Sequence, residues 1–406
     1  MNKHLYRIIF NKARGLLMVV AEIASAGREG GRRVRRSKTA VCQCRLSSLS
    51  CAMLALFSSV LVVNSAFAGI VADGQAPNNQ QPHIVSTANG TPQVNIQTPS
   101  QGGVSRNTYS QFDVGQNGVI LNNSRQNTAT QQGGMILGNP WLARGEATVI
   151  LNEVNSRDPS QLNGYVEVAG RQAQVVIANP AGITCDGCGF INANRATMTT
   201  GQAQLNNGQL TGFDVERGEI VIQGAGMDNS RQDHTDIIAR SVKINASLVA
   251  KDLKVTAGRN QVDASHRQID KKATGGSNRP MMAVDVAQLG GMYANKIRLM
   301  GTENGVGVHN AGNIGAQAGT LVVTADGRIE NSGQMSGQEG VSIASNGAIE
   351  NSGAVRSGAD ANLTAAGDLH NSGAVTANNH LQTKSATLNS EREACWRRGL
   401  IRMASW

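Results

Sequence analysis

Two cysteines separated by two residues are the clearest candidates for chemistry in this sequence. The segment 185–188 (CDGC) has a spacing found both in zinc sites and in thiol redox motifs. A zinc site needs about four ligands, and no second pair of cysteines or histidines lies near it in the sequence. A thioredoxin-like site needs a helix at the motif, whereas residues 189–192 (GFIN) read as a turn and a strand. The sequence therefore favours a local disulfide between Cys185 and Cys188, with a modest stabilising effect because its loop is short.

The histidines offer little further chemistry. All seven are dispersed, and only His234, beside Asp233 and Asp236, resembles a set of ligands. We expect that cluster to be a solvated loop. The sequence has no nucleophile elbow, Walker loop or His-Glu-x-x-His motif. It therefore predicts no catalytic residue, metal, cofactor or enzymatic activity; a polysaccharide lyase built on a β-helix is the enzymatic alternative.

The net charge of +9 belongs to the amino-terminal segment. Residues 1–50 hold eleven basic and two acidic residues, and the rest of the chain holds 26 of each sign. The body therefore has no field that would steer nucleic acid to it, and we predict no nucleic-acid partner.

An uncharged apolar run, residues 51–68, follows the basic segment and ends in Ala-Phe-Ala. Basic region, apolar region and small-residue site in this order predict a secretory signal peptide, exported by the Sec machinery and cleaved between Ala68 and Gly69. A transmembrane anchor is the alternative, but the run is only just long enough for a span and is interrupted by Asn64.

Short β-branched and aliphatic runs, each followed by Asn, Gly or Asp, recur from Gly69 onward. Examples are residues 147–151, 165–168, 175–178, 219–223 and 296–300. Each has the length of a short strand, and long helical periodicity is absent. The sequence predicts an all-β fold.

A repeat with a period of about 20 residues, a length typical of solenoid proteins, lies near the end of the chain. Its copies are residues 328–333 (RIENSG), 348–353 (AIENSG) and 368–373 (DLHNSG), with a fourth copy at 308–312 (VHNAG). Apolar residues keep the same register: Met335, Val355 and Val375 are equivalent, as are Ile343 and Leu363. The fixed period therefore predicts a solenoid in this region.

A right-handed parallel β-helix fits this repeat better than leucine-rich repeats, which need several leucines per copy. Small residues suit its narrow interior, and Gly and Asn accept the backbone angles at its corners. Roughly fifteen coils would stack about 4.8 Å apart, so Asn331, Asn351 and Asn371 should form a polar ladder. We expect residues 69–110 to cover the exposed edge of the first coil.

The chain resembles filamentous haemagglutinins and contact-dependent growth inhibition exoproteins, which use two-partner secretion. Residues 1–15 look like their extended signal peptide, and family-like motifs follow in order at 109–114 (YSQFDV), 138–143 (GNPWLA), 150–154 (ILNEV), 178–183 (ANPAGI) and 189–192 (GFIN). The resemblance covers residues 1–15 and about 69–310. It implies four parts: the extended signal peptide 1–68, a two-partner secretion (haemagglutinin-type) domain 69–310, β-helix repeats of a fibre shaft 308–390, and an aberrant tail 391–406.

Two Asn-Pro pairs carry the motifs by which such domains are expected to be recognised. The family often has Asn after each pair, where this chain has Trp and Ala. Because the pairs themselves persist, the resemblance assigns a turn and transporter-recognition role to Asn139, Pro140, Asn179 and Pro180 only. A purely structural turn is an equally open interpretation, since Asn-Pro favours turn initiation.

The resemblance implies that the chain stays unfolded in the periplasm and binds a dedicated outer-membrane barrel transporter, for which strand addition is a suitable mode. Folding outside the cell then favours export. The product is predicted to be a secreted or cell-surface adhesin with an unknown receptor on a host or neighbouring cell. A carrier stem for a contact-dependent toxin and a haemolysin of the same secretion class are the alternatives.

The composition changes after residue 390. Residues 391–398 (EREACWRR) lack the small residues and Asn-Gly corners of the repeats. We expect a frameshift or premature stop here, with the missing part carrying the remaining shaft and tip. Residues 391–406 should then be frayed, with no paired coil above them.

Overall fold

The computed structural model describes residues 6–11, 16–21, 69–272, 279–391 and 394–398. Ala68 and the rest of the apolar signal segment lie outside the described residues. In the leader, β1 (Tyr6–Asn11) and β2 (Leu16–Ala21) pair as an antiparallel hairpin. This hairpin and the chain from Gly69 onward belong to separate units.

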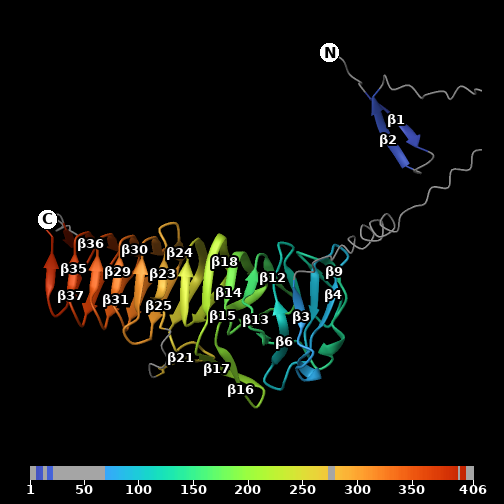
Figure 1. Cartoon of the computed structure of the whole chain (residues 1–406), viewed down its shortest axis with the longest axis horizontal. Helices are drawn as coiled ribbons and strands as arrows, with labels where there is room; N and C mark the ends of the chain where they lie inside the picture. Colours follow the sequence, from blue (N-terminus) through green and yellow to red (C-terminus); the bar gives the residue numbers. More distant parts are fainter. Residues whose placement is uncertain (1–5, 12–15, 22–68, 273–278, 392–393, 399–406) are drawn as a thin grey trace, which may run out of the picture. The chain divides into compact units, whose positions relative to one another are not determined.

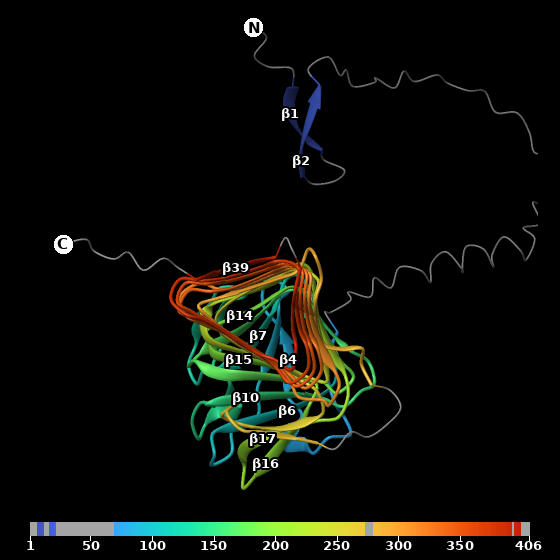
Figure 2. The same ribbon diagram turned by 90° about the vertical axis from the view of Figure 1, so that its left-hand side faces the viewer.

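The chain from Gly69 onward is a parallel β-helix, as the sequence predicts. Its coils succeed one another along one axis in Figure 1, and Figure 2 shows the later coils stacked in view along it. The described helical segments are the short 3-10 turns η1 (Asn78–Gln80) and η2 (Pro140–Leu142). Among the described residues, no helix has the length and apolar character needed to cross a membrane.

Antiparallel strands cover the first coil. β3 (Ile70–Ala72) pairs antiparallel with β6 (Val104–Phe112), and β4 (His83–Ser86) forms a hairpin with β5 (Pro92–Asn95). β5 then pairs parallel with β7 (Val119–Asn123), which belongs to the solenoid. The expected cap in residues 69–110 is therefore confirmed, and it shields an edge that would otherwise template aggregation.

The coils between the cap and residue 301 are irregular in length. Their parallel strands are β10 (Val149–Val154), β11 (Ser160–Leu162), β12 (Tyr165–Gly170), β13 (Ala173–Ala178), β14 (Ile183–Ile191), β15 (Ala193–Thr199), β18 (Glu219–Ala239), β19 (Ser241–Ile244), β20 (Ser247–Ala257), β23 (Met282–Val286), β24 (Gly291–Ala294) and β25 (Lys296–Gly301). Two antiparallel insertions leave this stack. One is the hairpin β8 (Thr128–Thr130) and β9 (Gly134–Ile136).

The second insertion is an antiparallel sheet on the side of the solenoid. It consists of β16 (Gln202–Asn206), β17 (Gln209–Val215), β21 (Asn260–Asp263) and β22 (Ile269–Lys271). It packs on its own apolar cluster, in which Phe213 and Val262 of the sheet meet Leu151 and Val176 of the coils. In both views β16 and β17 project from the solenoid (Figures 1 and 2).

The coils after residue 301 are regular, with three short strands in each of the first four coils and two described strands in the last. These strands are β26 (Gly307–Asn310), β27 (Asn313–Ala316), β28 (Thr320–Ala325), β29 (Ile329–Asn331), β30 (Gln334–Gly337), β31 (Gly340–Ser345), β32 (Ile349–Asn351), β33 (Ala354–Ser357), β34 (Asp360–Ala365), β35 (Leu369–Asn371), β36 (Ala374–Ala377), β37 (Leu381–Lys384), β38 (Leu388–Ser390) and β39 (Cys395–Arg398). Every strand pairs parallel with its equivalent in the next coil where one is described.

The predicted registers are confirmed in these coils. Met335 aligns with Val355, which aligns with Val375, and Ile343 aligns with Leu363. All five are buried in one apolar core that runs through the solenoid. Because side chains alternate between interior and surface along each strand, stacking identical patterns buries a continuous apolar column.

The predicted asparagine ladder is also confirmed, and it begins one coil earlier than predicted. Asn310 Nδ2 donates to Asn331 Oδ1 at 2.8 Å, Asn331 Nδ2 to Asn351 Oδ1 at 2.7 Å, and Asn351 Nδ2 to Asn371 Oδ1 at 2.7 Å. All four side chains are buried. Among the described residues, Asn310 Oδ1 and Asn371 Nδ2 find no partner, so the ladder is open at both ends.

The expectation that residues 391–406 are frayed is wrong for the part of this tail that is described. β39 pairs parallel with β36, so that Cys395 aligns with Ala374 and Trp396 with Val375. Trp396 is half-buried against the apolar core and donates from Nε1 to Ser390 Oγ at 3.0 Å. Despite its unusual composition, this segment adds the large side chain of Trp396 to the apolar core, at the position equivalent to Val375.

Candidate functional site: the Asn-Pro turns and the bridged cysteines

The first Asn-Pro pair begins a 3-10 turn that closes over the solenoid. Asn139 caps η2, and its Oδ1 accepts a hydrogen bond from Trp141 N at 3.0 Å. Its Nδ2 donates to the carbonyls of Ile96 and Asn122, both at 2.9 Å. The Asn139 side chain is 3% exposed, whereas Pro140 lies at the surface. The asparagine therefore holds the loop against two coils, because its amide satisfies two backbone acceptors at once.

The second pair forms the same local turn at the end of β13. Asn179 Oδ1 accepts from Ala181 N at 2.9 Å, and Nδ2 donates to Asp158 O and Ser160 Oγ at 3.0 Å each. Asn179 is fully buried, and Pro180 is half-buried. This side-chain turn fits both asparagine positions, because Asn readily bonds to the backbone two residues ahead.

The structure does not bring the two turns together. Asn139 donates to the carbonyl of Asn122. Asn122 aligns with Ala169 near the end of β12, the strand that precedes β13. Asn179 follows Ala178, the last residue of β13. The turns therefore lie at opposite ends of β13, and the folded domain presents them as separate features.

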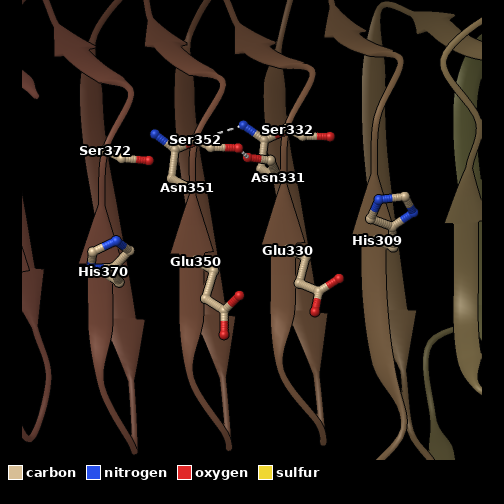
Figure 3. A pocket seen from close by; sticks show the side chains of 9 residues that line it. All are labelled: His309, Glu330, Asn331, Ser332, Glu350, Asn351, Ser352, His370 and Ser372. Carbon is tan, nitrogen blue, oxygen red and sulfur yellow. Dashed lines mark hydrogen bonds between the residues drawn. The ribbon is translucent and has the colours of Figure 1, made fainter.

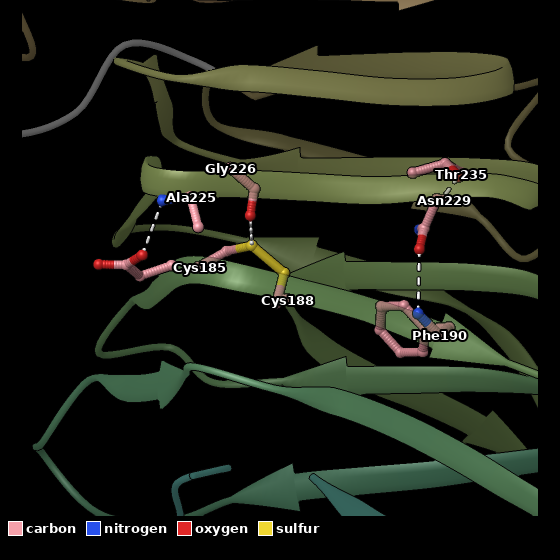
Figure 4. Close-up of a disulfide and its surroundings, with 8 residues drawn as sticks. Cys185, Cys188, Phe190, Ala225, Gly226, Asn229 and Thr235 are labelled. Atoms are coloured by element: carbon pink, nitrogen blue, oxygen red, sulfur yellow. Dashed lines mark hydrogen bonds between the residues drawn. A yellow bond between two sulfur atoms is a disulfide. The ribbon is translucent and has the colours of Figure 1, made fainter. Parts of the chain in front are cut away.

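Cys185 and Cys188 form a disulfide within β14 (Figure 4), with an S–S distance of 1.97 Å and a Cα–Cα distance of 5.3 Å. Both cysteines belong to the buried core. The strand bulges between them, where Gly187 adopts a φ of 76° that suits glycine. Asp186 Oδ1 accepts from Ala225 N at 2.8 Å and ties the bulge to β18 in the next coil. The disulfide therefore holds this bulge from within the core. Because both sulfurs are buried, they are not accessible to a second thiol.

Buried asparagines in the irregular coils hold neighbouring segments together, and the sequence did not reveal these positions. Asn123 Nδ2 donates to Ala147 O and Arg171 O at 2.9 and 2.8 Å, and Asn123 Oδ1 accepts from Ala147 N at 2.8 Å. Asn152 Oδ1 accepts from the hydroxyl of buried Tyr109 at 2.9 Å, and burial raises the pKa of Tyr109. The sequence offers one weak signal for these positions, the frequent occurrence of Asn at turns. No repeat marks them, because they lie outside the regular coils.

The expectation that His234 and Asp236 lie in a solvated loop is wrong. Both belong to β18, and Asp236 is buried beneath the inserted antiparallel sheet. Asp236 lies 3.0 Å from His266 Nδ1 and 3.5 Å from Arg195 Nε. Arg195 supplies a positive charge beside this buried carboxylate, and the contact with His266 links the inserted sheet to the coils.

A polar row on the regular coils is another place where ionisable side chains gather (Figure 3). His309, Glu330, Glu350 and His370 take successive equivalent positions beside a depression of about 300 Å³. Neighbouring charges already engage three of them, since Asp285 contacts His309, Arg328 contacts Glu330, and Glu391 contacts His370. Within the described ranges no group of three or more His, Cys, Asp or Glu side chains is arranged to hold a metal ion.

Three family matches cover nearly the whole chain. Residues 68–331 match the TPS secretion domain, residues 1–54 match the Extended Signal Peptide of Type V secretion system, and residues 335–402 match the Haemagglutinin repeat. The repeat match continues past residue 390, into the segment expected to be an aberrant tail.

Named relatives share the same region. The chain is 66% identical over 350 residues to the toxin CdiA of Yersinia pestis, covering 84% of this chain and 10% of that protein. It is 48% identical over 340 residues to the tRNA nuclease CdiA-2 of Burkholderia pseudomallei, covering 82% and 11%. The chain therefore spans about a tenth of the length of these relatives. It also resembles the crystal structure of a filamentous hemagglutinin secretion domain, with a TM-score of 0.58 and 29% identity over 81% of this chain and 99% of that one.

Proposed function

The chain belongs to the TPS secretion domain family, and on that premise we propose that residues 69–310 direct export through a dedicated outer-membrane barrel transporter. Residues 308–390 then begin the shaft of a haemagglutinin-like surface adhesin. The extended signal peptide and secretion domain send the chain through the periplasm and outer membrane to the cell surface or the medium. We further propose Sec export, cleavage between Ala68 and Gly69, and no catalysis by this region.

One observation supports this proposal above the others: the solenoid is closed at its amino-terminal end and every later coil pairs with the coil before it. The cap made by β3 to β6 can therefore fold first, and each emerging coil finds a finished edge to pair with. In a stack of this kind stability adds coil by coil. Folding on the outer side would then draw the chain outward without another energy source.

Recognition at the Asn-Pro pairs would involve the unfolded chain. In the folded domain, Asn139 and Asn179 engage their amides with neighbouring coils, and of the two prolines only Pro140 lies at the surface. A periplasmic chain has not yet made those bonds, so both segments are free to pair with the transporter. One motif could thus serve recognition first and turn formation afterwards.

A secretion assay separates recognition from turn formation. The chain is expressed with a two-partner transporter, and the secreted fraction is compared for the parent, Pro140→Ala and the control Pro77→Ala, another exposed proline beside a 3-10 turn. We expect Pro140→Ala to lower secretion about tenfold with an unchanged melting temperature of the purified protein. Parental secretion, or equal losses of secretion and stability, would reject the recognition role.

The disulfide in the secreted protein is part of the same proposal. Export through the periplasm exposes Cys185 and Cys188 to an oxidising compartment. Non-reducing mass spectrometry of protein from the medium should find one intramolecular bridge between them. Two free thiols at these positions would show that the bridge is not formed in the exported chain.

A carrier stem for a contact-dependent toxin is the second candidate, and the identity to the toxin CdiA of Yersinia pestis favours it. The two functions need the same secretion region and differ in the segment encoded after the repeats. Reading the coding DNA beyond codon 406 distinguishes them. Further repeats of the same period leading to a nuclease-like segment, together with growth arrest of neighbouring cells in co-culture, would support the stem.

A further inference from the structure

A cavity of about 240 Å³ opens on the outer face of the irregular coils, outside every site considered so far. It lies along one row of stacked positions. Tyr165 aligns with Gly189, and Gly189 aligns with Asp228. Because Gly189 has no side chain, the ring of Tyr165 can lie over this position. A Cβ at Gly189 would lie 2.4 Å from Tyr165 Cε1 and 2.6 Å from Asp228 O, so the aromatic ring rests on this glycine.

Two irregular segments wall the cavity and both are held in place. On one side the register of β18 shifts after Asn229, and the displaced residues Ser230 to Gln232 form the wall. On the other side stands Gln131 in the β8–β9 turn. The buried carboxylate of Glu167 accepts from Gln131 N at 2.6 Å and from Gln132 N at 2.9 Å. The cavity is therefore preformed, as small-ligand sites commonly are.

The groups that line the cavity include hydrogen-bond acceptors and donors beside an aromatic ring. Gln232 is 3% exposed and donates to Phe190 O at 2.6 Å, while its Oε1 has no donor among the described residues. Such an unpaired buried acceptor is costly unless a ligand or water supplies a donor. Hydrogen bonds from the backbone and then the hydroxyl of Ser230 lower the pKa of Asp228 and keep it ionised, which makes it a pure acceptor. Arg231 is exposed and supplies only donors.

We propose that this cavity binds one pyranose unit of a glycan. The C–H face of the sugar packs on Tyr165, which is 36% exposed, while its hydroxyls donate to Gln232 Oε1 and Asp228 and accept from Arg231. Hydroxyl groups suit this set because each one both donates and accepts. One carboxylate and one guanidinium balance each other, so a neutral sugar is favoured. This role goes beyond export, because it uses the folded domain after secretion.

Ligand-observed saturation-transfer NMR on the secreted chain tests the proposal. The probes are the methyl α-D-pyranosides of glucose, galactose and mannose. At least one should bind with a Kd on the order of 1–10 mM, as expected for a single small ring. Tyr165→Ala and Gln232→Met should each weaken it about tenfold. Tyr293→Ala is the matched control, since Tyr293 lies on the same outward row two coils beyond Asp228.

The outcomes are decisive in both directions. Binding that is lost in both cavity variants and kept in the Tyr293 variant supports the site, provided that circular dichroism shows the same melting temperature for all four proteins. No binding of any probe below about 50 mM, on the order of the weakest useful affinity, overturns it. Binding that survives both cavity substitutions also overturns it, as does displacement of the sugar by glycine, whose ammonium and carboxylate would fit Asp228 and Arg231 better. Secretion is unaffected by the cavity variants if the two proposals are independent.

Discussion

The irregular coils before residue 301 and the regular coils after it are held together in different ways. Before residue 301, single asparagines and ion pairs fasten loops and an inserted sheet, as with Asn123 and with Asp236 beside His266. After it, equivalent side chains stack from coil to coil, and the asparagine ladder from Asn310 to Asn371 repeats one interaction three times. The first region is specified position by position, whereas the second is specified by its period.

This difference fits the export route proposed above. In that route, a region that is recognised by the transporter and folds first needs individual features, such as a cap, a bulged corner and an inserted sheet. A region that only extends the solenoid needs coils whose edge can pair with any equivalent coil that follows. In a nearest-neighbour stack, damage to one coil should stay near that coil. Damage in the irregular part should travel further, because its insertions touch several coils.

The largest expected effect comes from truncating a buried leucine in each region. Leu363→Ala should lower the free energy of unfolding of the regular coils by about 3 kcal/mol, because it empties a fully packed position. Hydrogen exchange should rise in β31, β34 and β37 only. Leu151→Ala is the matched variant, and it should also expose β17 and β21, whose Phe213 and Val262 share its cluster. If hydrogen exchange rose over an equally wide set of strands in both variants, the distinction between the two regions would be lost.

The next effect concerns the three hydrogen bonds of the buried Asn123 side chain. Asn123→Ala should destabilise the irregular coils by about 2 kcal/mol, because three backbone groups lose partners and two of them belong to the buried residue Ala147. Urea unfolding of the purified chain, followed by circular dichroism, measures the change. Asn122→Ala is less suited as a control since it too is buried; exposed Asn127→Ala serves better. If Asn123→Ala lowered the free energy of unfolding no more than Asn127→Ala does, the hydrogen bonds of Asn123 would not contribute to stability.

The same contrast explains how far the structure could be predicted from the sequence. The repeat predicts the register of Met335, Val355 and Val375 correctly, because repetition turns one pattern into many aligned positions. No such redundancy exists for Asp236, whose partner His266 comes from an inserted sheet later in the chain. The predicted solvated loop at Asp236 and the predicted fraying of the tail around Trp396 are wrong for a related reason. In both cases the segment is placed by partners distant in the sequence, His266 for Asp236 and β36 for β39.

The asparagine ladder offers a smaller and internally controlled test. Asn351→Leu should cost about 1.5 kcal/mol, because it leaves Asn331 Nδ2 without its acceptor and Asn371 Oδ1 without its donor. Asn371→Leu should cost less, since its own Nδ2 already lacks a partner among the described residues. Thermal unfolding of the two variants ranks them. The reverse order, or no difference, would show that the ladder does not act through these amide bonds.

The smallest effect should come from surface charge on the inserted sheet. Lys272 and then Arg259 donate to Glu216 and lower its pKa below the ordinary value of 4.5. A lowered carboxylate pKa stabilises the fold above pH 4.5, and that contribution is lost as the pH falls through the lower value of the folded state. Because Glu216 is half exposed, Glu216→Gln should cost no more than about 0.5 kcal/mol at pH 7. Melting temperatures of parent and variant should therefore differ slightly at pH 7 and converge as the pH falls through the lowered pKa of Glu216. A gap that persists or widens in acid would show that Glu216 acts through packing, and not through its charge.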